Sequence, residues 1–372
     1  MKTKFKLSVL ALSLVVAIGI QSCKKDDTVN NNVVNNKNIP IKFKVDIPTS
    51  LSRNEGAKNK SAKSDTLHGN TIYHHLCTFI WVGEGAADVI QDIMIAISTH
   101  NINQAMSFSY VSGQDGRTKN AVVVVNSDYE GTTWNFEMTI TDALSQSNAD
   151  GGKALQVFWN TSPVKGIAIL KPYNVNRTQY ASYPDPLYRV DYSEAGELGY
   201  TNQMYVYLIN LPLANPLTDP YSMKTMKMFA GKNGNYIDVL GNSDHPNAKF
   251  FTTQTGFDYA FVASCNASSN IAVAEVGLPL STLNSTSRVV ILKDNSIKNV
   301  FTTQIYQTWP TIDSTTVAAY LYNTGAPGYF NSNGFIQGGT SPSSSYNDLE
   351  ARMNLLSPYN PNDVTNLTLV FK

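Results

Sequence analysis

The sequence predicts a β-rich α+β protein: a mostly antiparallel, curved sheet, built as a half-barrel or a sandwich, with one amphipathic helix packed on it. Three observations lead to this class. Short segments of alternating apolar and polar residues recur along the chain and are separated by turn residues. Only one long segment has clear helical spacing, so strands do not alternate with helices as they do in parallel sheets. Charged residues make up only 15% of the chain, and polarity comes mainly from Asn, Ser, Thr, Gln and Tyr, which suits a β-rich exported protein.

The clearest helix is expected over residues 83–97. Its apolar residues recur with helical period and form one stripe, which we expect to pack on the apolar face of the sheet. Two shorter helices are expected, one from a cap at Asp313 or Ser314 to about Leu321, and one over residues 346–356. The stripe of the long helix consists of Val89, Ile90, Ile93, Met94 and Ile97.

The remaining elements are expected to be strands. The first covers residues 39–48 and is followed by a long loop over about 49–70, and a second long loop is expected over 324–345. The segments 154–160 and 164–170 are apolar on both faces, which is typical of central strands and of strands that line a ligand pocket. The other expected strands cover residues 105–111, 121–125, 133–140, 187–193, 203–212, 225–230, 236–241, 258–265, 271–279, 287–294, 299–309 and 365–371.

The first 22 residues have the layout of a secretory signal peptide. Three lysines precede an apolar run from Leu7 to Ile20, which is shorter than the roughly 20 residues that a membrane-spanning helix needs. Ser22 and Cys23 follow, and a cysteine directly after a small residue resembles the lipobox of bacterial lipoproteins. The resemblance implies cleavage before Cys23 and attachment of diacylglycerol to its sulfur, so that the mature chain is anchored to a membrane.

Residues 23–38 are expected to form a flexible tether. They begin with Cys-Lys-Lys-Asp-Asp and continue into an asparagine-rich run that has too little apolar area to fold. The charged start resembles the export signal of surface lipoproteins of Bacteroidota, which implies display on the outer membrane at the cell surface. Residues 39–372 are expected to form a single β-rich domain, because no shift in composition divides them.

Charge and cysteine content narrow the choice of partners and compartment. The whole chain has a formal charge of zero, and removal of residues 1–22 takes away three lysines and no acid, which leaves about −3. No long basic run is present, so nucleic acid is not an expected partner. With Cys23 acylated, Cys77 and Cys265 remain. They either form one disulfide, which an oxidising compartment allows, or are two separate buried thiols, and the sequence leaves both alternatives open.

The sequence contains no local motif of an enzyme. It has no Gly-x-Ser-x-Gly elbow, no His-Glu-x-x-His helix, no Walker loop and no dinucleotide-binding glycine pattern. The adjacent His74 and His75 would point to opposite faces of a strand and could not reach one ion together. A zinc site drawing on His74, His100 and Asp244 or His245 is less favoured than ordinary hydrogen-bonded histidines. We therefore assign no catalytic residue, no metal ligand and no cofactor.

Two further features could belong to a binding site. The densest polar segment, residues 241–248 (GNSDHPNA), is predicted to be an ordered turn rather than a calcium or ligand loop, because Asn, Asp and Ser side chains bond to their own backbone in turns. The chain also has 20 tyrosines, 15 phenylalanines and 4 tryptophans, and Tyr205 and Tyr207 share one face of an expected strand. Such side chains serve glycan stacking and apolar pockets, and they are also common on exposed sheets.

Together these features predict a lipid-anchored protein of the outer membrane with a non-enzymatic binding role. The first expectation is an apolar or lipid ligand in a pocket of the curved sheet, because the pair 154–160 and 164–170 is apolar on both faces. In outline this arrangement resembles the lipid-carrying half-barrels of envelope transport lipoproteins. The alternative is a glycan-binding lipoprotein or an accessory lipoprotein of a transporter. A protein complex of the cell envelope is a further possible partner. A surface hydrolase is the third, less favoured reading, and the ligand-binding residues are not identified by any motif.

Overall fold

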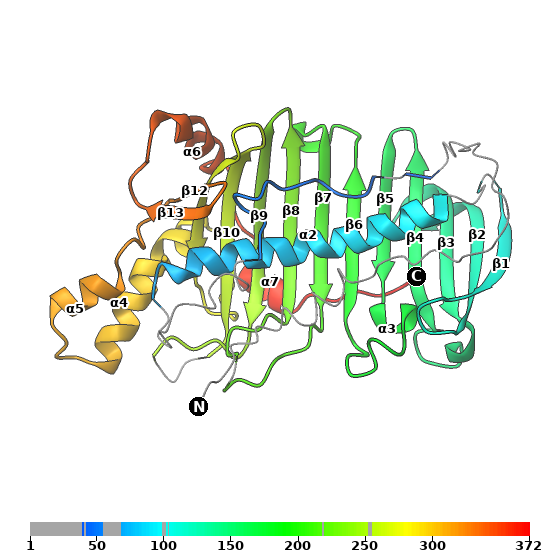
Figure 1. Cartoon of the computed structure of the whole chain (residues 1–372), viewed down its shortest axis with the longest axis horizontal. Helices are drawn as coiled ribbons and strands as arrows, with labels where there is room; N and C mark the ends of the chain where they lie inside the picture. The colour runs from blue at the N-terminus through cyan, green and yellow to red at the C-terminus, as the bar shows by residue number, and fades with distance from the viewer. Residues whose placement is uncertain are drawn as a thin grey trace. The chain divides into compact units, whose positions relative to one another are not determined.

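The sheet is antiparallel wherever its register is described, as predicted. Thirteen strands are present in the described part of the chain (Figure 1). The β-rich class with a mostly antiparallel sheet and a helix packed on it is therefore confirmed. The expected signal peptide, Cys23 and the tether lie outside the described residues. The structure, a computed structural model, describes residues 39–40, 42–54, 68–98, 102, 104–217, 219–251 and 255–372.

The chain divides into two compact units, and the division falls within one helix, α2 (Thr71–Ser98), between Glu84 and Gly85. That residues 39–372 form a single domain stays a prediction. In the described part of the chain, unit 1 consists of Val45–Glu84 and Leu211–Leu367, and unit 2 consists of the residues up to Lys44, Gly85–Asn210 and Thr368–Lys372.

Unit 2 is a meander of seven strands in which each strand pairs with the next. The expected hairpin between residues 105–111 and 121–125 is present. A core cluster of Trp134, Phe158 and neighbouring isoleucines packs against Phe371 near the end of the chain. The elements are β1 (Met106–Val111), β2 (Thr118–Tyr129), β3 (Thr132–Asp142), η3 (Ala143–Ser145), β4 (Lys153–Thr161), β5 (Val164–Leu170), α3 (Pro172–Val175), β6 (Leu187–Ser193), η4 (Glu197–Gly199) and β7 (Asn202–Ile209).

Unit 1 contains six further strands, again paired in sequence order. Short helices after β11 pack on the face of the sheet that carries Ala260 and Val262, and Leu349 and Met353 fill the core there. The elements are β8 (Thr225–Asn233), β9 (Tyr236–His245), β10 (Phe257–Asn266), β11 (Ile271–Gly277), η5 (Val289–Asp294), α4 (Ile297–Thr308), α5 (Ser314–Tyr320), β12 (Gly328–Asn331), β13 (Gly334–Gly338), η6 (Ser344–Tyr346), α6 (Asn347–Met353) and α7 (Pro361–Thr365).

Helix α2 contains the expected helix over 83–97 but begins twelve residues earlier, at Thr71. Its first half is rich in β-branched and aromatic residues, which favour strands when considered alone, and packing overrides that preference. In unit 1 the helix lies against the strands (Figure 1): a Cβ added to Gly83 would come within 2.8 Å of the Met228 methyl group on β8. Among the described helices, none is long and apolar enough to cross a membrane.

The strand predicted over residues 39–48 is wrong, although its alternation is real. Phe43, Val45 and Ile47 are buried, but the segment pairs with no strand in the described part of the chain. Its backbone N–H groups donate to side chains of α2 instead, from Phe43 to Gln91 Oε1 (3.1 Å) and from Ile47 to Glu84 Oε1 (2.9 Å). The alternation of apolar and polar residues therefore predicts correctly which side chains are buried. The backbone N–H groups, however, bond to side chains of a helix and not to a neighbouring strand.

Three more predicted strands are wrong, because short apolar segments fit the residue spacing of a helix as well as that of a strand. Residues 287–294 lie largely in η5 and residues 299–309 largely in α4. Ser296 is the N-cap of α4, and its hydroxyl accepts a hydrogen bond from the Asn299 N–H. Their β-branched residues suggested strands, whereas the buried positions of α4 have helical spacing. Thr365 is the last residue of α7, and residues 366–371 follow it without forming a strand.

The remaining corrections concern loops. The long loop predicted over 324–345 contains the hairpin of β12 and β13, and the turn predicted over 241–248 is the buried end of β9 as far as His245, followed by a turn at Pro246. The helix capped by Asp313 and the helix near 346–356 are confirmed as α5 and α6.

Candidate functional site

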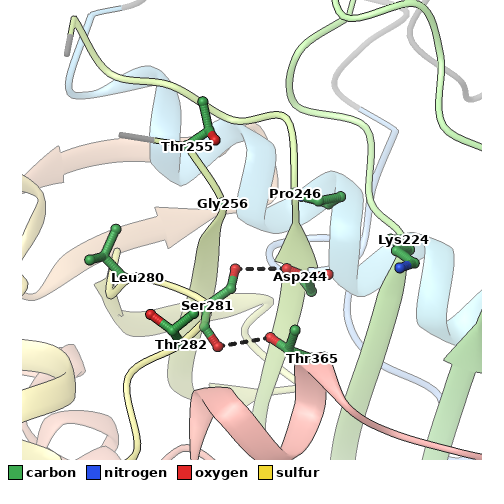
Figure 2. Close-up of a pocket in the computed structure, with 9 residues that line it drawn as sticks. All are labelled: Lys224, Asp244, Pro246, Thr255, Gly256, Leu280, Ser281, Thr282 and Thr365. Carbon is green, nitrogen blue, oxygen red and sulfur yellow. Dashed lines mark hydrogen bonds between the residues drawn. The ribbon is translucent and has the colours of Figure 1, made fainter. Parts of the chain in front are cut away.

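A pocket with a volume of about 410 Å³ opens in unit 1 where β9 ends and β10 begins (Figure 2). Five separate parts of the sequence contribute to it, and hydroxyl-bearing side chains are the most numerous type in its lining. Its walls are formed by Lys224, Asp244, Pro246, Thr255, Gly256, Leu280, Ser281, Thr282 and Thr365.

Backbone hydrogen bonds fix the segments that form the pocket. The N–H of Gly256 donates to the carbonyl of Ala248 (3.1 Å), and the N–H of Ser281 donates to the carbonyl of Gly256 (2.9 Å). Gly256 has a φ of +85°, a left-handed conformation that glycine adopts without the steric cost of a Cβ. These contacts join the start of β10 to the segment that follows β11, and they place Ser281 beside the end of β9.

The polar side chains of the pocket are held by one another. Ser281 Oγ donates to Asp244 Oδ1 at 2.7 Å, and Thr365 Oγ1 donates to the carbonyl oxygen of Ser281 at 3.0 Å (Figure 2). Asp244 is only 2% exposed and Ser281 only 7% exposed. Burial raises the pKa of Asp244, while the hydrogen bond from Ser281 and the positive charge of Lys224 lower it, and the balance is a raised pKa.

A second carboxylate lies directly behind this wall. Asp258 on β10 is the cross-strand partner of Asp244 and is completely buried. Asn242 Nδ2 donates to Asp258 Oδ2 at 3.3 Å, and Asp258 Oδ1 has no hydrogen-bond partner among the described residues. Burial, and secondarily the negative charge of Asp244, raise the pKa of Asp258 well above its usual value. A perturbed carboxyl group next to a cavity is a common property of functional sites.

Among the described residues, the histidines considered as zinc ligands do not meet at a metal site. His245 is completely buried, with Nε2 2.8 Å from Ser243 Oγ and Nδ1 2.8 Å from the carbonyl oxygen of Tyr221. His75 lies on α2, not on a strand, with Nδ1 3.2 Å from the Tyr259 hydroxyl. Burial lowers the pKa of His245 to about 3 and of His75 to about 4, so both rings are neutral at pH 7.

No group of three or more His, Cys, Asp and Glu side chains in the described ranges could hold a metal ion. His74 packs edge-on against Phe335, and His100 lies outside the described residues. The structure therefore does not bring His74 together with Asp244 or His245 as metal ligands. The contact of Ser243 with His245 is that of a nucleophile with a base, but both side chains are completely buried and neither lines the pocket.

Cys77 and Cys265 are both buried free thiols in the structure. Cys77 Sγ points to the carbonyl oxygen of Ser50 at 3.8 Å and Cys265 Sγ to that of Ile237 at 3.3 Å. Of the two alternatives that the sequence left open, the structure has the separate thiols. Burial raises the pKa of the Cys265 thiol, which makes it a poor nucleophile.

Tyr205 and Tyr207 lie side by side on β7 in unit 2, with ring centroids 6.4 Å apart and planes inclined by 18°. The guanidinium of Arg189 lies over Tyr207 at 5.5 Å, and it binds the carboxylates of both Glu130 and Asp191. Both tyrosines are partly buried, so this face is an ordered cluster of aromatic and ionic groups rather than a flat exposed aromatic platform.

Most residues that line the pocket cannot be predicted from the sequence. Its residues are separated by up to about 140 positions, from Lys224 to Thr365, and no spacing marks them. The one signal in the sequence is the polar segment 241–248, which contains Asp244 but whose composition predicts a turn. Comparison with known proteins adds no guide, because no protein-family model, no curated protein and no solved structure matches this chain.

Proposed function

We propose that this chain is a lipid-anchored binding protein of the bacterial cell envelope whose pocket holds a small polyhydroxylated ligand, such as one sugar unit of a glycan. The observation that carries the proposal is the pocket of about 410 Å³, whose lining includes four hydroxyl-bearing side chains, one carboxyl group and one ammonium group. Ligand sites of this kind measure roughly 300–1,000 Å³ and hold a few placed polar groups. The exposed hydroxyl groups of Thr255 and Thr282 can donate and accept the hydrogen bonds that sugar hydroxyls require, and the exposed ammonium group of Lys224 can donate them.

The apolar ligand expected from residues 154–160 and 164–170 gains no specific support. These segments are β4 and β5, and their apolar side chains belong to the core of unit 2. On one face of β4, Val157 and Trp159 are completely buried, and on the other Phe158 packs with Ile167 and Ile169. Being apolar on both faces reflects a central position in the sheet. The geometry therefore favours the glycan-binding alternative.

Lipid anchoring is expected to depend on Cys23 alone. Cys23→Ser removes the sulfur that the lipobox resemblance assigns as the acylation site, so the protein is expected to lose metabolic labelling with palmitate and to leave the membrane fraction. Lys25→Ser, two residues away, keeps the cysteine and is the matched control, expected to stay labelled. Palmitate labelling, intact mass and membrane fractionation are measured for all three proteins. An unlabelled wild-type protein, or a labelled Cys23→Ser variant, contradicts lipid attachment at Cys23.

Ligand binding is expected to depend on open space in the pocket. Thr282 lines the pocket and is exposed, so Thr282→Trp fills the cavity without disturbing the core. The full-length protein, extracted in detergent and applied to a glycan array, is expected to retain at least one glycan, and Thr282→Trp is expected to lose that retention by at least tenfold. Thr286→Trp is the matched control, because Thr286 is exposed on the same segment and does not line the pocket. Absence of retention by the wild-type protein rejects a glycan ligand.

A further inference from the structure

We propose that Asp244 and Asp258 hold one proton between them, so that the pocket is electrically neutral and takes an uncharged polyhydroxylated ligand in preference to an acidic or a basic one. The ligand preference rests on the proposed function, whereas the shared proton does not.

The two carboxyl groups are neighbours by the register of the sheet. Asp258 stands directly opposite Asp244 in the antiparallel pair of β10 and β9, so both side chains are on the same face. Directly opposed residues have Cβ atoms roughly 4.5–5.5 Å apart. Asp258 is 0% exposed and Asp244 is 2% exposed. Two carboxylates at this separation and away from water do not both ionise near neutral pH, because each charge raises the cost of the other.

The hydrogen bonds show which of the two is neutral. Asp244 receives a short hydrogen bond from Ser281 and feels the positive charge of Lys224. Asp258 receives one long hydrogen bond from Asn242, and its Oδ1 has no partner among the described residues. The hydroxyl groups of Ser281 and Thr365 stand nearby, but each has a single hydrogen, which is donated elsewhere. A buried ionised carboxylate needs several donors, so Asp258 is the protonated member of the pair.

The charged groups Lys227, Glu275 and Asp363 on the neighbouring elements contact other groups or face solvent. On β8, the Lys227 ammonium lies over the Tyr359 ring at 4.2 Å. On β11, Glu275 is paired with Arg288, and on α7, Asp363 is exposed.

The charge of the site is then one negative charge on Asp244 and one positive charge on Lys224. With Asp258 neutral, these two charges cancel. The raised pKa values of Asp244 and Asp258 have the direction that this arrangement requires.

A carboxyl carbon titration tests the shared proton without any ligand. The full-length protein with ¹³C-labelled aspartate is expected to show one carboxyl resonance that keeps the shift of a protonated acid at pH 7. Asp258→Asn, which has the shape of a neutral acid, is expected to fold and to lose this resonance. Asp244→Asn is expected to keep this resonance but to move the midpoint of its titration to lower pH, because the negative charge of Asp244 is removed. A spectrum in which every aspartate is ionised at pH 7 overturns the shared proton.

The ligand preference is tested with neutral, acidic and basic polysaccharides: galactan and dextran, polygalacturonate, and diethylaminoethyl-dextran. At pH 7 the wild-type protein and Asp258→Asn are both expected to bind a neutral polysaccharide at least tenfold more tightly than either charged one. Stronger binding to polygalacturonate or diethylaminoethyl-dextran overturns the preference. If the protonated resonance is present but the protein binds no polysaccharide, the proposed function and the ligand preference fail together while the shared proton stands.

Discussion

Lys119→Met is expected to lower the free energy of unfolding by about 3–5 kcal/mol, because it removes the ion-pair partner of the buried Asp115 carboxylate and leaves the buried Asp142 carboxylate with Arg117 alone. Lys119 is 2% exposed, and its Nζ lies 2.8 Å from Asp142 Oδ2, 3.1 Å from Asp115 Oδ2 and 2.9 Å from the carbonyl oxygen of Asn174. Burial raises the pKa of Asp142, but hydrogen bonds from Arg117, Lys119 and Ser145 more than offset this and hold it below its usual value. Urea denaturation measures the loss.

Lys165→Met is the matched control for this variant. Lys165 also forms an ion pair, with Glu197 at 2.7 Å, but the two side chains are 39% and 40% exposed. Water solvates and screens such a pair, so its removal is expected to change the free energy of unfolding by less than about 1 kcal/mol. Equal losses for the two lysine variants would contradict the assignment of the buried network as a major source of stability in unit 2.

Acid is expected to destabilise unit 1 through His245. Its folded-state pKa of about 3 lies below the value of roughly 6.5 in an unfolded chain, so the stability that the neutral ring contributes is present above pH 6.5 and is lost as the pH falls. The loss is about 1.4 kcal/mol for each pH unit between 6.5 and 3. His75, with a pKa of about 4, adds a loss of the same sign down to that pH.

His245→Gln isolates this contribution. Glutamine does not titrate, so the variant is expected to lose stability at pH 7 but to show a slope of stability against pH that is flatter by about 1.4 kcal/mol per unit between pH 6 and 4. Ser243→Ala removes the hydroxyl next to His245 Nε2 and keeps the histidine, so it is expected to keep the wild-type slope. Denaturant midpoints at pH 7, 6, 5 and 4 provide the comparison, and an unchanged slope in His245→Gln would contradict a neutral buried ring.

The fold class is predictable from the sequence because most strands pair with strands that are close to them along the chain. β4, β5 and β6 have nearly the limits that alternation and turn residues predict, and each pairs antiparallel with the next strand along the chain. The predictions failed where a distant partner decides the structure. Residues 39–48 alternate like a strand but bond to α2, and Thr71–Val82 have strand-forming residues but are held as a helix by packing on the sheet.

The candidate site was less predictable than the fold for the same reason. Asp244 and Asp258 become a pair only through the register of β9 and β10, and Ser281 and Thr365 reach them from far along the chain. Asp244 belongs to the polar segment 241–248, but its role in the candidate site depends on Asp258 on the opposite strand and on the pocket beside it. Cys23, by contrast, was assigned from a local pattern, and that assignment stays a prediction because it lies outside the described residues.

The most direct test of the central claim is the affinity of three proteins for a retained glycan, measured by isothermal titration calorimetry. The wild-type protein and Thr286→Trp are predicted to bind with the same affinity. Thr282→Trp, which fills the pocket, is predicted to bind at least tenfold more weakly while unfolding at the same temperature. Equal affinities for all three proteins would show that the ligand binds elsewhere and would contradict the assignment of the pocket.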